Sequence, residues 1–303
     1  KQIYHDAWQL LHISTLRKYL DLESSNVKFE GFKYDLERVI DDIILLCIFV
    51  GNDFLPHLPS LDIAESAIDV MFTMYKQELP TMGGYLTNSG NININRLERI
   101  MVLLGNREEE VFTERLKTID KQNARNKKNA RYNRGGTSRP NTVVPEWLSN
   151  SASTDVNATN ATKIAYYNEK FGLNTGEGST KDDQMCHGRI VRAYLEGLEW
   201  TLTYYTDTCK NWQWKYNYHY PPLFEDLIKY IPYFDTTLLT ENYDKVSPIT
   251  QLCYVLPKSS FGLIPEETKT KLLDALGYKY PDEYEFNWAF CKYFWEAHIS
   301  LPE

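Results

Sequence analysis

Residues 37–63 read ERVIDDIILLCIFVGNDFLPHLPSLDI and combine a long apolar run with a proline-rich segment. The pattern predicts a helix over residues 35–50, in which Asp35 caps the N-terminus and Glu37 lies in the first turn. The run IILLCIFV (43–50) is apolar on every side, so this half of the helix is expected to be buried all round. The segment therefore predicts a core helix around which the rest of the chain packs.

The segment GNDFLPHLP (51–59) follows this helix and carries the first candidate site. Gly51 is placed to end the helix in a left-handed conformation, and the prolines keep the next residues irregular. A carboxylate at the end of a buried helix suits a divalent metal, because Mg²⁺ prefers oxygen ligands and needs only one or two protein carboxylates. The alternative for Asp53 is that it only caps the following turn. Both roles remain open from the residues alone.

Other polar residues near the apolar segments carry less chemical information. Asp41 and Asp42 are expected to be solvated or to lie in the N-terminal part of the helix, where the dipole favours negative charge, and not to share a metal with Asp53. His57 is expected to be a hydrogen-bonded structural residue, because no second His stands at metal-ligand spacing. Cys186 and His187 likewise have no supporting ligands nearby in the sequence.

The remaining pattern predicts a mostly α-helical chain with few strands. A long apolar stripe beginning near Arg189 and reaching Tyr205 predicts one further long helix. A short extended piece is expected at residues 85–86, between two turn signals. Further helices are expected at residues 4–22, 63–78, 94–104, 223–231, 248–255, 266–276 and 286–297.

Composition divides the chain into three parts. Residues 1–118 and 184–303 are rich in apolar residues, whereas residues 119–183 are polar and partly basic. We expect 119–183 to be a mobile insert with one short helix at 165–171, because it offers little apolar surface to bury. Its basic part, 121–139, is expected to be a solvated linker, or alternatively an arm that contacts phosphates.

The second candidate site is the aromatic sequence NWQWKYNYHYPP (211–222), together with Trp200 and the Tyr204–Tyr205 pair. Rings interleaved with lysines fit stacking on unpaired bases, at about 1–3 kcal/mol per base. Lys215 and His219 are the candidates for further RNA contacts. The alternative is an aromatic core cluster, and we expect most of the rings to be packed with one or two free to stack.

Overall composition excludes several classes of protein. The chain has 303 residues, of which 43% are hydrophobic, so a wholly disordered chain is excluded. Its net charge of −8 argues against coating of nucleic acid by bulk positive charge, although a local basic groove remains compatible with it. Five cysteines without a Cys-x-x-Cys pair favour a reducing intracellular compartment over a disulfide framework or zinc ribbon. No apolar run reaches the ~18 residues of a membrane span, so no membrane association is expected.

Several stretches of this chain resemble the 5′→3′ exoribonucleases of the Xrn/Rat family. The match over residues 37–63 is nearly the family signature, and residues 83–101 resemble the segment that follows it. Residues 192–222 resemble the second conserved region of the family. LLHISTLRKYLDLE (10–23) and FNWAFCKYFWEAHISLPE (286–303) are similar to further parts of the catalytic core. The resemblance covers nearly the whole chain apart from the insert and is slightly closer to the nuclear Rat-type branch than to the cytoplasmic branch.

The resemblance implies the distal part of a PIN/flap-nuclease-like α/β core plus a helical second conserved region. It implies a metal-dependent enzyme that degrades single-stranded, 5′-monophosphorylated RNA to nucleoside monophosphates, with two Mg²⁺ or Mn²⁺ ions in the intact active site. Asp53 is the one metal-binding, catalytic acid that matches; the other acids and the 5′-phosphate pocket are expected upstream of Lys1, in a longer chain. An accessory protein of the Rat-type branch is an implied partner, and the nucleus is favoured over the cytoplasm.

The family resemblance also implies a tryptophan that stacks near the bound 5′ end, and here Trp212 and Trp214 are the candidates. We expect the two rings to point to opposite sides of the loop, so that one is buried and the other exposed. We favour Trp214 as the stacking residue, because Lys215 beside it is placed to meet a phosphate. Two rival functions remain: a non-catalytic RNA-binding scaffold derived from the family, and a helical protein-interaction module unrelated to RNA.

Overall fold

The computed structural model describes residues 10–26, 28–132, 156–231, 239–283, 285–287 and 298–300. Within these residues the chain is mostly helical, as the sequence predicts. No helix in the described part of the chain has the length and apolar character needed to cross a membrane. The helices are α1 (Ile13–Ser24), α2 (Leu36–Ile48), α3 (Ala67–Glu78), α4 (Ile94–Tyr132), α6 (Val156–Phe171), α7 (Lys181–Thr206), α8 (Phe224–Tyr230), α9 (Pro248–Val255) and α10 (Glu266–Leu276).

Short elements connect these helices. In the described part of the chain the strands form two antiparallel pairs: β1 (Thr87–Asn88) with β2 (Asn91–Ile92), which make a hairpin, and β3 (Glu285–Asn287) with β4 (His298–Ser300). The first pairs Thr87 with Ile92, and the second pairs Phe286 with Ile299. Single turns of 3₁₀ helix lie at Ile63–Glu65, Leu79–Thr81, Lys258–Leu263 and Gly277–Lys279.

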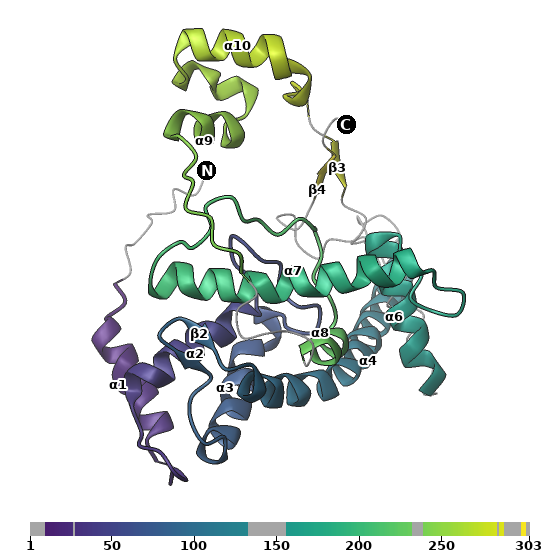
Figure 1. Cartoon of the computed structure of the whole chain (residues 1–303). Coiled ribbons are helices and arrows are strands. Elements are labelled where there is room, and N and C mark those ends of the chain that lie inside the picture. Colours follow the sequence, from purple (N-terminus) through teal and green to yellow (C-terminus); the bar gives the residue numbers. More distant parts are fainter. Residues whose placement is uncertain are drawn as a thin grey trace.

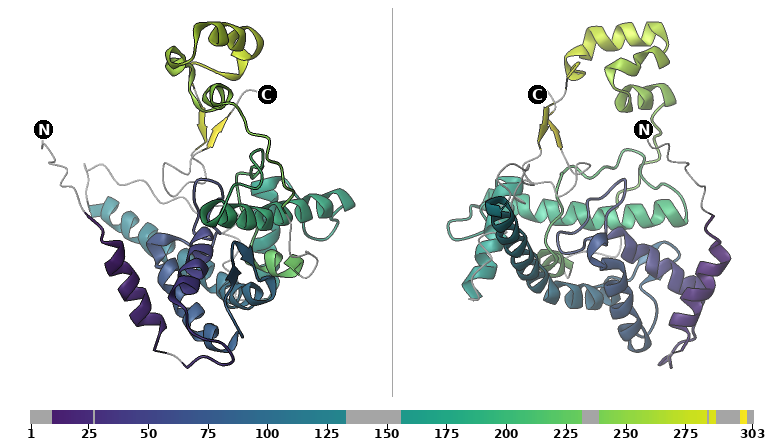
Figure 2. Two further views of the ribbon diagram at one scale, coloured as in Figure 1. Left: turned by 60° about the vertical axis from the view of Figure 1, so that its left-hand side comes forward. Right: turned by 180° about the vertical axis from the view of Figure 1, so that it is seen from behind.

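The body of the molecule has α7 lying across a layer formed by α2, α3, α4 and α8 (Figure 1). Views from two other directions show α1 on the outer side of this layer and α6 beside the far ends of α4 and α7 (Figure 2). One large core fills the space between them and includes Leu45, Phe49, Leu198 and Phe224, which are all buried. The apolar stripe of α7 thus supplies one wall of the core and α2 supplies another.

Helix α2 forms where the sequence predicts it. The Asp35 side chain accepts a hydrogen bond from the Glu37 N–H at 3.0 Å and caps the helix. Gly51 lies in the left-handed region with φ of 90°, as expected. The burial is less uniform than predicted, because Ile43, Ile44 and Cys47 are only half-buried.

The expectation that Asp42 is solvated is wrong: its side chain is fully buried. Each carboxylate oxygen accepts two hydrogen bonds. Oδ2 accepts from Tyr75 Oη and Leu86 N, both at 2.7 Å. Oδ1 accepts from Thr87 N at 2.8 Å and Thr87 Oγ1 at 2.7 Å. Asp42 therefore ties α2 to α3 and to the first hairpin, whose strand β1 begins one residue beyond the predicted extended piece at 85–86.

The polar segment 119–183 contains more helix than its composition predicts. Helix α4 continues to Tyr132 and α6 begins at Val156, so the short helix expected at 165–171 is the end of a longer one. Helix α7 begins at Lys181, where Thr180 and Asp183 form a reciprocal capping box. The predicted boundaries near 118 and 183 consequently fall inside α4 and α7. Residues 133–155 lie outside the described part of the chain.

The predicted helix at 286–297 is not what the described residues show there. Residues 285–287 and 298–300 pair as β3 and β4, and residues 288–297 lie outside the described part. Phe286 and Ile299 face each other across this pair, which the helical spacing of the apolar residues did not reveal. The first predicted helix begins later than expected, at Ile13, and residues 4–9 also lie outside the described part.

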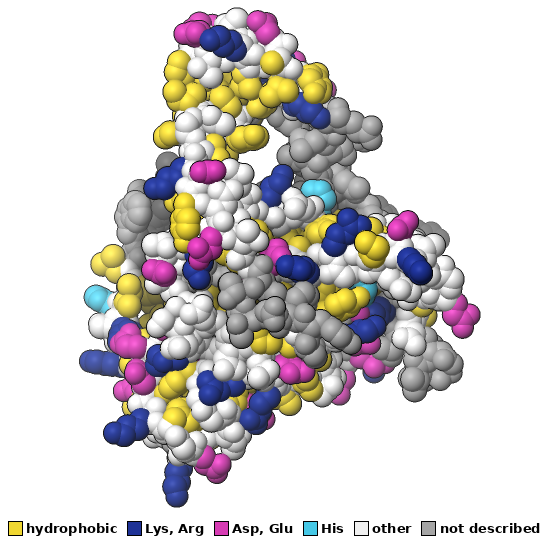
Figure 3. Space-filling model, viewed as in Figure 1, with side chains coloured by type: hydrophobic (Ala, Val, Ile, Leu, Met, Phe, Trp, Pro, Cys, Tyr) yellow, Lys and Arg dark blue, Asp and Glu magenta, His cyan; other side chains and the backbone are white. Residues whose placement is uncertain are grey.

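Helices α9 and α10 form a small unit that projects from the body (Figure 1). In its described residues, 239–283, burial beyond residue 247 is confined to Phe261 and Ile264. Figure 3 shows hydrophobic side chains gathered along the edge of this unit that faces the rest of the molecule. The exposed apolar residues of the unit are Ile249, Leu252, Tyr254, Val255, Leu263, Leu276 and Tyr278.

Candidate functional site

The loop that carries Asp53 runs from Gly51 to Ser60 and is called the Asp53 loop. Its shape depends on its own backbone and on the Asn52 side chain. A Cβ at Gly51 would lie 2.9 Å from the backbone nitrogen of His57. The close turn therefore favours glycine, both because there is no room for a side chain and because the φ angle is positive. Asn52 Oδ1 accepts hydrogen bonds from Phe54 N at 2.8 Å and Leu55 N at 2.9 Å. These bonds fold the backbone so that the Asp53 side chain is exposed while Leu55 is buried.

The segment after Asp53 is anchored to α7 and α4. Tyr194 Oη on α7 donates to the Pro56 carbonyl at 3.1 Å. On α4, the Arg115 guanidinium donates to the Pro59 carbonyl and Glu108 accepts from Ser60 Oγ at 3.0 Å. His57 Nδ1 lies 3.1 Å from the Leu58 carbonyl, in keeping with the structural role expected for this histidine. Asp53 is therefore presented by a firmly held loop.

An aromatic stack lies directly beside this loop. Trp200 stacks on Tyr204 with ring centroids 5.2 Å apart and on Trp214 with centroids 5.1 Å apart. Phe54, the neighbour of Asp53, packs edge-on against Trp200 at 4.8 Å and Tyr204 at 5.3 Å. The two candidate sites predicted separately from the sequence are thus brought together by α7.

Gly197 on α7 makes this close approach feasible. A Cβ there would lie 2.6 Å from Leu55 Cδ2 and 2.9 Å from the Trp214 ring. Any side chain at this position would push the Asp53 loop or the Trp214 ring away from α7. The loop and the ring therefore share one contact surface on this helix.

Trp212 and Trp214 differ in exposure, but the exposed ring is Trp212 and Trp214 is half-buried rather than fully buried. Trp214 packs against the core and against Trp200, whereas the Trp212 side chain is 45% exposed. The preference for Trp214 as the exposed ring is therefore not met, because α7 offers it Trp200 and Gly197 as packing partners. Lys245 Nζ lies 5.5 Å from the centre of the Trp212 ring, and Trp212 N donates to the Asn242 carbonyl at 3.0 Å.

Further exposed rings lie close to Asp53. Tyr204 and Tyr205, at the end of α7, are 41% and 50% exposed. Burial and then the nearby negative charge of Asp53 raise the pKa of Tyr205. Residues 211–222 form the aromatic loop, which carries Trp212. Asp53 therefore lies beside exposed tyrosine rings, and Lys215 and His219 are exposed on the aromatic loop.

The residues present fit only part of a metal site. Across the described ranges, no group of three or more His, Cys, Asp or Glu side chains is placed to hold a metal ion. The exposed Asp53 carboxylate is suited to provide one oxygen ligand of a divalent ion.

Two buried acids that the sequence analysis did not identify hold the elements that carry this site. Glu108 on α4 and Asp226 on α8 are both buried. Asp226 accepts from Tyr167 Oη at 2.6 Å and pairs with Lys163 at 2.7 Å. His187 Nε2 lies 3.4 Å from Asp226, so this histidine is engaged in a buried structural cluster.

One sequence signal was available for Glu108 and none for Asp226. Glu108 continues the buried helical stripe of Leu97, Met101 and Leu104, at a position where the spacing calls for an apolar residue. A charge on such a stripe indicates a buried and partnered carboxyl group. Asp226 lies in the first turn of α8, where an acid is ordinarily explained by the helix dipole.

Comparison with known proteins agrees with this architecture. The family model described as the Xrn1 helical domain matches residues 33–165 and 158–303. The chain is 29% identical to the 5′-3′ exoribonuclease 2 homolog of Drosophila melanogaster, with 96% of this chain and 36% of that protein covered. It is 27% identical to 5′-3′ exoribonuclease 1 of Schizosaccharomyces pombe, covering 100% of this chain and 30% of that protein.

A third relative is 5′-3′ exoribonuclease 2 of Gallus gallus, at 29% identity over 96% of this chain and 37% of that protein. The chain spans about a third of the length of these curated relatives. The family model covers the chain from residue 33, just before α2, to residue 303. It includes both the Asp53 loop and the aromatic loop. The chain therefore belongs to the family of the Xrn1 helical domain.

Proposed function

We propose that this chain is the distal part of a 5′→3′ exoribonuclease that acts on single-stranded RNA. The observation that carries the proposal is the juxtaposition of the exposed Asp53 carboxylate with the partly exposed rings of Tyr204 and Tyr205. A carboxylate beside stacking rings suits a site where unpaired bases are held next to the phosphodiester that is cut. The names of the relatives, which are 5′-3′ exoribonucleases, support the same reaction class.

Each part of the surface has a distinct role in this proposal. The exposed ring of Trp212 stacks on a base, while Trp214 holds the loop in place through Trp200. Lys215 and His219 contact the phosphates or bases of nucleotides next to the stacked base. Because the net charge of the chain is −8, these contacts are local and depend on a few cations.

The metal requirement is part of the proposal. A divalent ion such as Mg²⁺ or Mn²⁺, when bound, supplies positive charge that stabilises the developing charge on the phosphate. Asp53 is the residue of this chain suited to hold it, together with carboxylates of a PIN/flap-nuclease-like core outside the described residues. The substrate is RNA with a 5′-monophosphate and the products are nucleoside monophosphates. A nuclear location and an accessory protein partner complete the proposal.

The test is the Asp53→Ala variant of the intact protein, with Asp69→Ala as the control. Asp69 is an exposed acid on α3, away from the Asp53 loop. Hydrolysis of 5′-phosphorylated single-stranded RNA in Mg²⁺ should be abolished or greatly reduced by Asp53→Ala and unchanged by Asp69→Ala. Thermal melting should be the same for both variants, because the Asp53 side chain is exposed.

Two results would contradict this function. Near-normal turnover by folded Asp53→Ala protein would remove Asp53 from the catalytic machinery. A wild-type protein that binds single-stranded RNA but does not hydrolyse it would instead be the RNA-binding scaffold.

A further inference from the structure

Glu108 on α4 links the Asp53 loop to the start of α8. Its Oε1 accepts from Ser60 Oγ at 3.0 Å, at the far end of the loop that begins with Gly51. Its Oε2 accepts from the backbone N–H of Phe224 at 3.1 Å, at the start of α8. Only 6% of the Glu108 residue is exposed, so the two bonds are largely shielded from bulk solvent.

The first turn of α8 also anchors the aromatic loop. Tyr167 Oη on α6 donates to Asp226 and accepts from Leu223 N at 3.1 Å. Tyr166 Oη donates to the Pro221 carbonyl at 2.7 Å, at the end of the aromatic loop. The supports of the Asp53 loop and of the aromatic loop therefore meet at residues 221–226, one through Glu108 and the other through α6.

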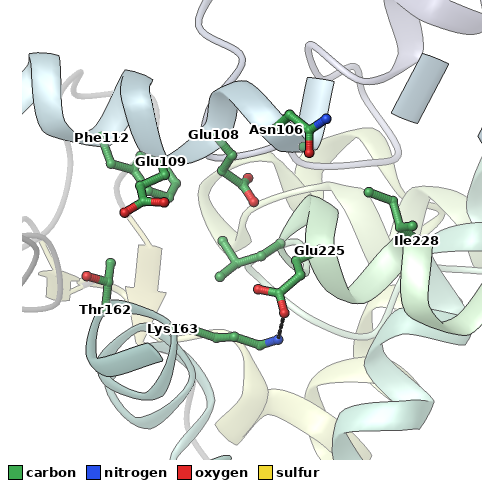
Figure 4. Close-up of a pocket in the computed structure, with 10 residues that line it drawn as sticks. Asn106, Glu108, Glu109, Phe112, Thr162, Lys163, Glu225 and Ile228 are labelled. Atoms are coloured by element: carbon green, nitrogen blue, oxygen red, sulfur yellow. Dashed lines mark ion pairs between the residues drawn. The ribbon is translucent and has the colours of Figure 1, made fainter. Parts of the chain in front are cut away.

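A cavity of about 290 Å³ lies next to this junction, between α4, α6 and α8 (Figure 4). Glu108 lines it together with Glu109 from α4, Lys163 from α6, and Glu225 from α8. The figure shows Lys163 paired with Glu225 across the cavity, which leaves Glu108 outside this ion pair. Glu108 therefore has the cavity on one side, and its hydrogen bond to Ser60 holds the Asp53 loop on α4 together with the bond from Arg115 to the Pro59 carbonyl.

We propose that Glu108, held as a neutral acid, is a positioning residue that fixes the Asp53 loop relative to the aromatic loop. In the neutral state Oε1 carries the proton and donates it to Ser60 Oγ, the reverse of the direction for an ionised carboxylate. Oε2 accepts from Phe224 N, and no charge is placed in the core. Ionised Glu108 would be a buried anion close to the carboxylates of α8. The proposed role deepens the exoribonuclease function proposed above and rests on it.

The groups around Glu108 agree with a neutral state. Burial raises the pKa of Glu108 to about 8, the hydrogen bonds from Ser60 and Phe224 N oppose this rise, and the charges of Asp226 and Glu225 add to it. From α6, Lys163 is engaged by Asp226 and Glu225, and Tyr166 is a neutral phenol whose pKa burial raises further. The Asp53 loop contributes Ser60, which does not titrate.

The sign of the pH dependence follows from the raised pKa. The folded protein binds a proton at Glu108 that the unfolded chain loses above its ordinary pKa near 4.5. Stability from this group is therefore complete below about 4.5 and decreases as the pH rises to about 8. Over this range the unfolding equilibrium constant should rise by up to about tenfold per pH unit relative to a variant without the proton.

The experiment compares wild type, Glu108→Gln, Glu108→Ala and Ser60→Ala in the intact protein, with Glu110→Gln as the matched control. Glu110 is an exposed acid two residues along the same helix. Unfolding is measured between pH 5 and pH 9, and hydrogen exchange is measured for the peptide that contains residues 51–61. Glu108→Gln should remove the pH slope and keep the loop protected. Glu108→Ala and Ser60→Ala should increase exchange in the loop by about tenfold or more, whereas Glu110→Gln should match wild type.

RNA hydrolysis provides the second readout. For wild type, kcat should fall as the pH rises above about 8, and Glu108→Gln should lack this decrease. Glu108→Ala should lower kcat by on the order of tenfold to a hundredfold with little change in KM, because Asp53 is displaced while base stacking persists.

Several outcomes would overturn the role of Glu108. These are an unchanged pH slope in Glu108→Gln, or loop exchange and kcat that stay at wild-type values in Ser60→Ala and Glu108→Ala. If Glu108→Ala fails to fold, Ser60→Ala and Glu108→Gln still decide the question. If wild type does not hydrolyse RNA, the proposed function fails, while hydrogen exchange of the loop still tests the role of Glu108.

Discussion

Asp42 and Asp53 belong to one helix–loop segment, yet burial gives them different roles. Asp42 is fully buried and accepts four hydrogen bonds, whereas Asp53 is exposed at the candidate site. Burial raises the pKa of Asp42, and the four donors partly offset this effect. At the residue scale, function is therefore expected where a carboxylate has solvent access, and stability where its oxygens are saturated by donors.

Asp42→Ala should destabilise the protein on the order of 3–5 kcal/mol. The substitution leaves Tyr75 Oη and the N–H groups of Leu86 and Thr87 buried without their acceptor, at about 1–3 kcal/mol for each unsatisfied group. Urea unfolding measures the change. Asp41→Ala is the control, since Asp41 is only half-buried, and it should cost about 0.5 kcal/mol. Equal effects of the two substitutions would contradict the structural role of Asp42.

At the element scale, the aromatic loop has one face against α7 and one face exposed. Trp214 stacks on Trp200 and lies against Gly197. Trp212 lies beside the segment that contains Asn242 and Lys245. Strand alternation does not explain this difference, because residues i and i+2 of an extended segment share a face, whereas residues 212–213 form a turn. The turn and the contacts with α7 decide which ring is covered. The consequence is that the two tryptophans should respond differently to substitution.

Trp214→Ala should cost about 3 kcal/mol of stability, because it removes a ring packed against the core. Trp212→Ala should change stability by less than about 0.5 kcal/mol and weaken single-stranded RNA binding by ~1–3 kcal/mol. The loss should be similar for all four bases, because stacking uses the ring face. Thermal melts and RNA binding titrations of both variants measure these effects. If both proteins were equally destabilised and bound RNA with unchanged affinity per folded molecule, the loop would be a core cluster only.

Helix α6 is the element whose role differs most from its composition. It lies in the segment expected to be an insert, yet Tyr166 and Tyr167 are both buried and hold the end of the aromatic loop. An apolar fraction averaged over a long segment hides two buried tyrosines in one helix. The anchoring of the loop therefore depends on a part of the chain that composition alone assigns to solvent.

Tyr167→Phe should destabilise the protein by about 1–3 kcal/mol. The change keeps the ring but removes a donor to Asp226 and an acceptor for Leu223 N, both of which are buried. Tyr19→Phe, at an exposed tyrosine of α1, is the control and should have almost no effect. Urea unfolding of the two variants decides whether α6 is a structural clamp, since matching curves would exclude it.

At the scale of the whole molecule, stability is expected to be uneven. The body has an extended core shared by α2, α4, α7 and α8, whereas α9 and α10 have no buried residues of their own. Phe261 and Ile264 are the buried residues between them, and Tyr280 packs edge-on against Phe261 at 4.9 Å. A unit with so little buried apolar surface opens more easily than the body.

Hydrogen exchange should detect this difference. Amides of residues 248–276 should exchange at least about a hundredfold faster than those of residues 190–203 in α7, after correction for intrinsic rates. The comparison is internal to one sample, so α7 serves as the control for solution conditions. Equal protection of the two segments would mean that the apolar edge of α9 and α10 is covered in solution.

Much of the fold was determined by local sequence. Helix α2 with its Asp35 cap, the left-handed Gly51, and helices α8, α9 and α10 lie close to their predicted positions, because caps, prolines and helical spacing act over a few residues. The candidate site was also indicated in part, since the Asp53 loop and the aromatic loop were both recognised. How they lie relative to each other was not, because no local pattern encodes the contact of either loop with α7.

Tertiary structure decided the rest. It buried Asp42 and exposed Trp212 rather than Trp214, since burial depends on which neighbours a residue meets from distant parts of the chain. It also brought Glu108 of α4 to the first turn of α8, which carries Asp226, and made both acids buried supports of the two loops. Local sequence fixes where helices begin and end, whereas long-range packing fixes the solvation of each side chain and hence its chemistry.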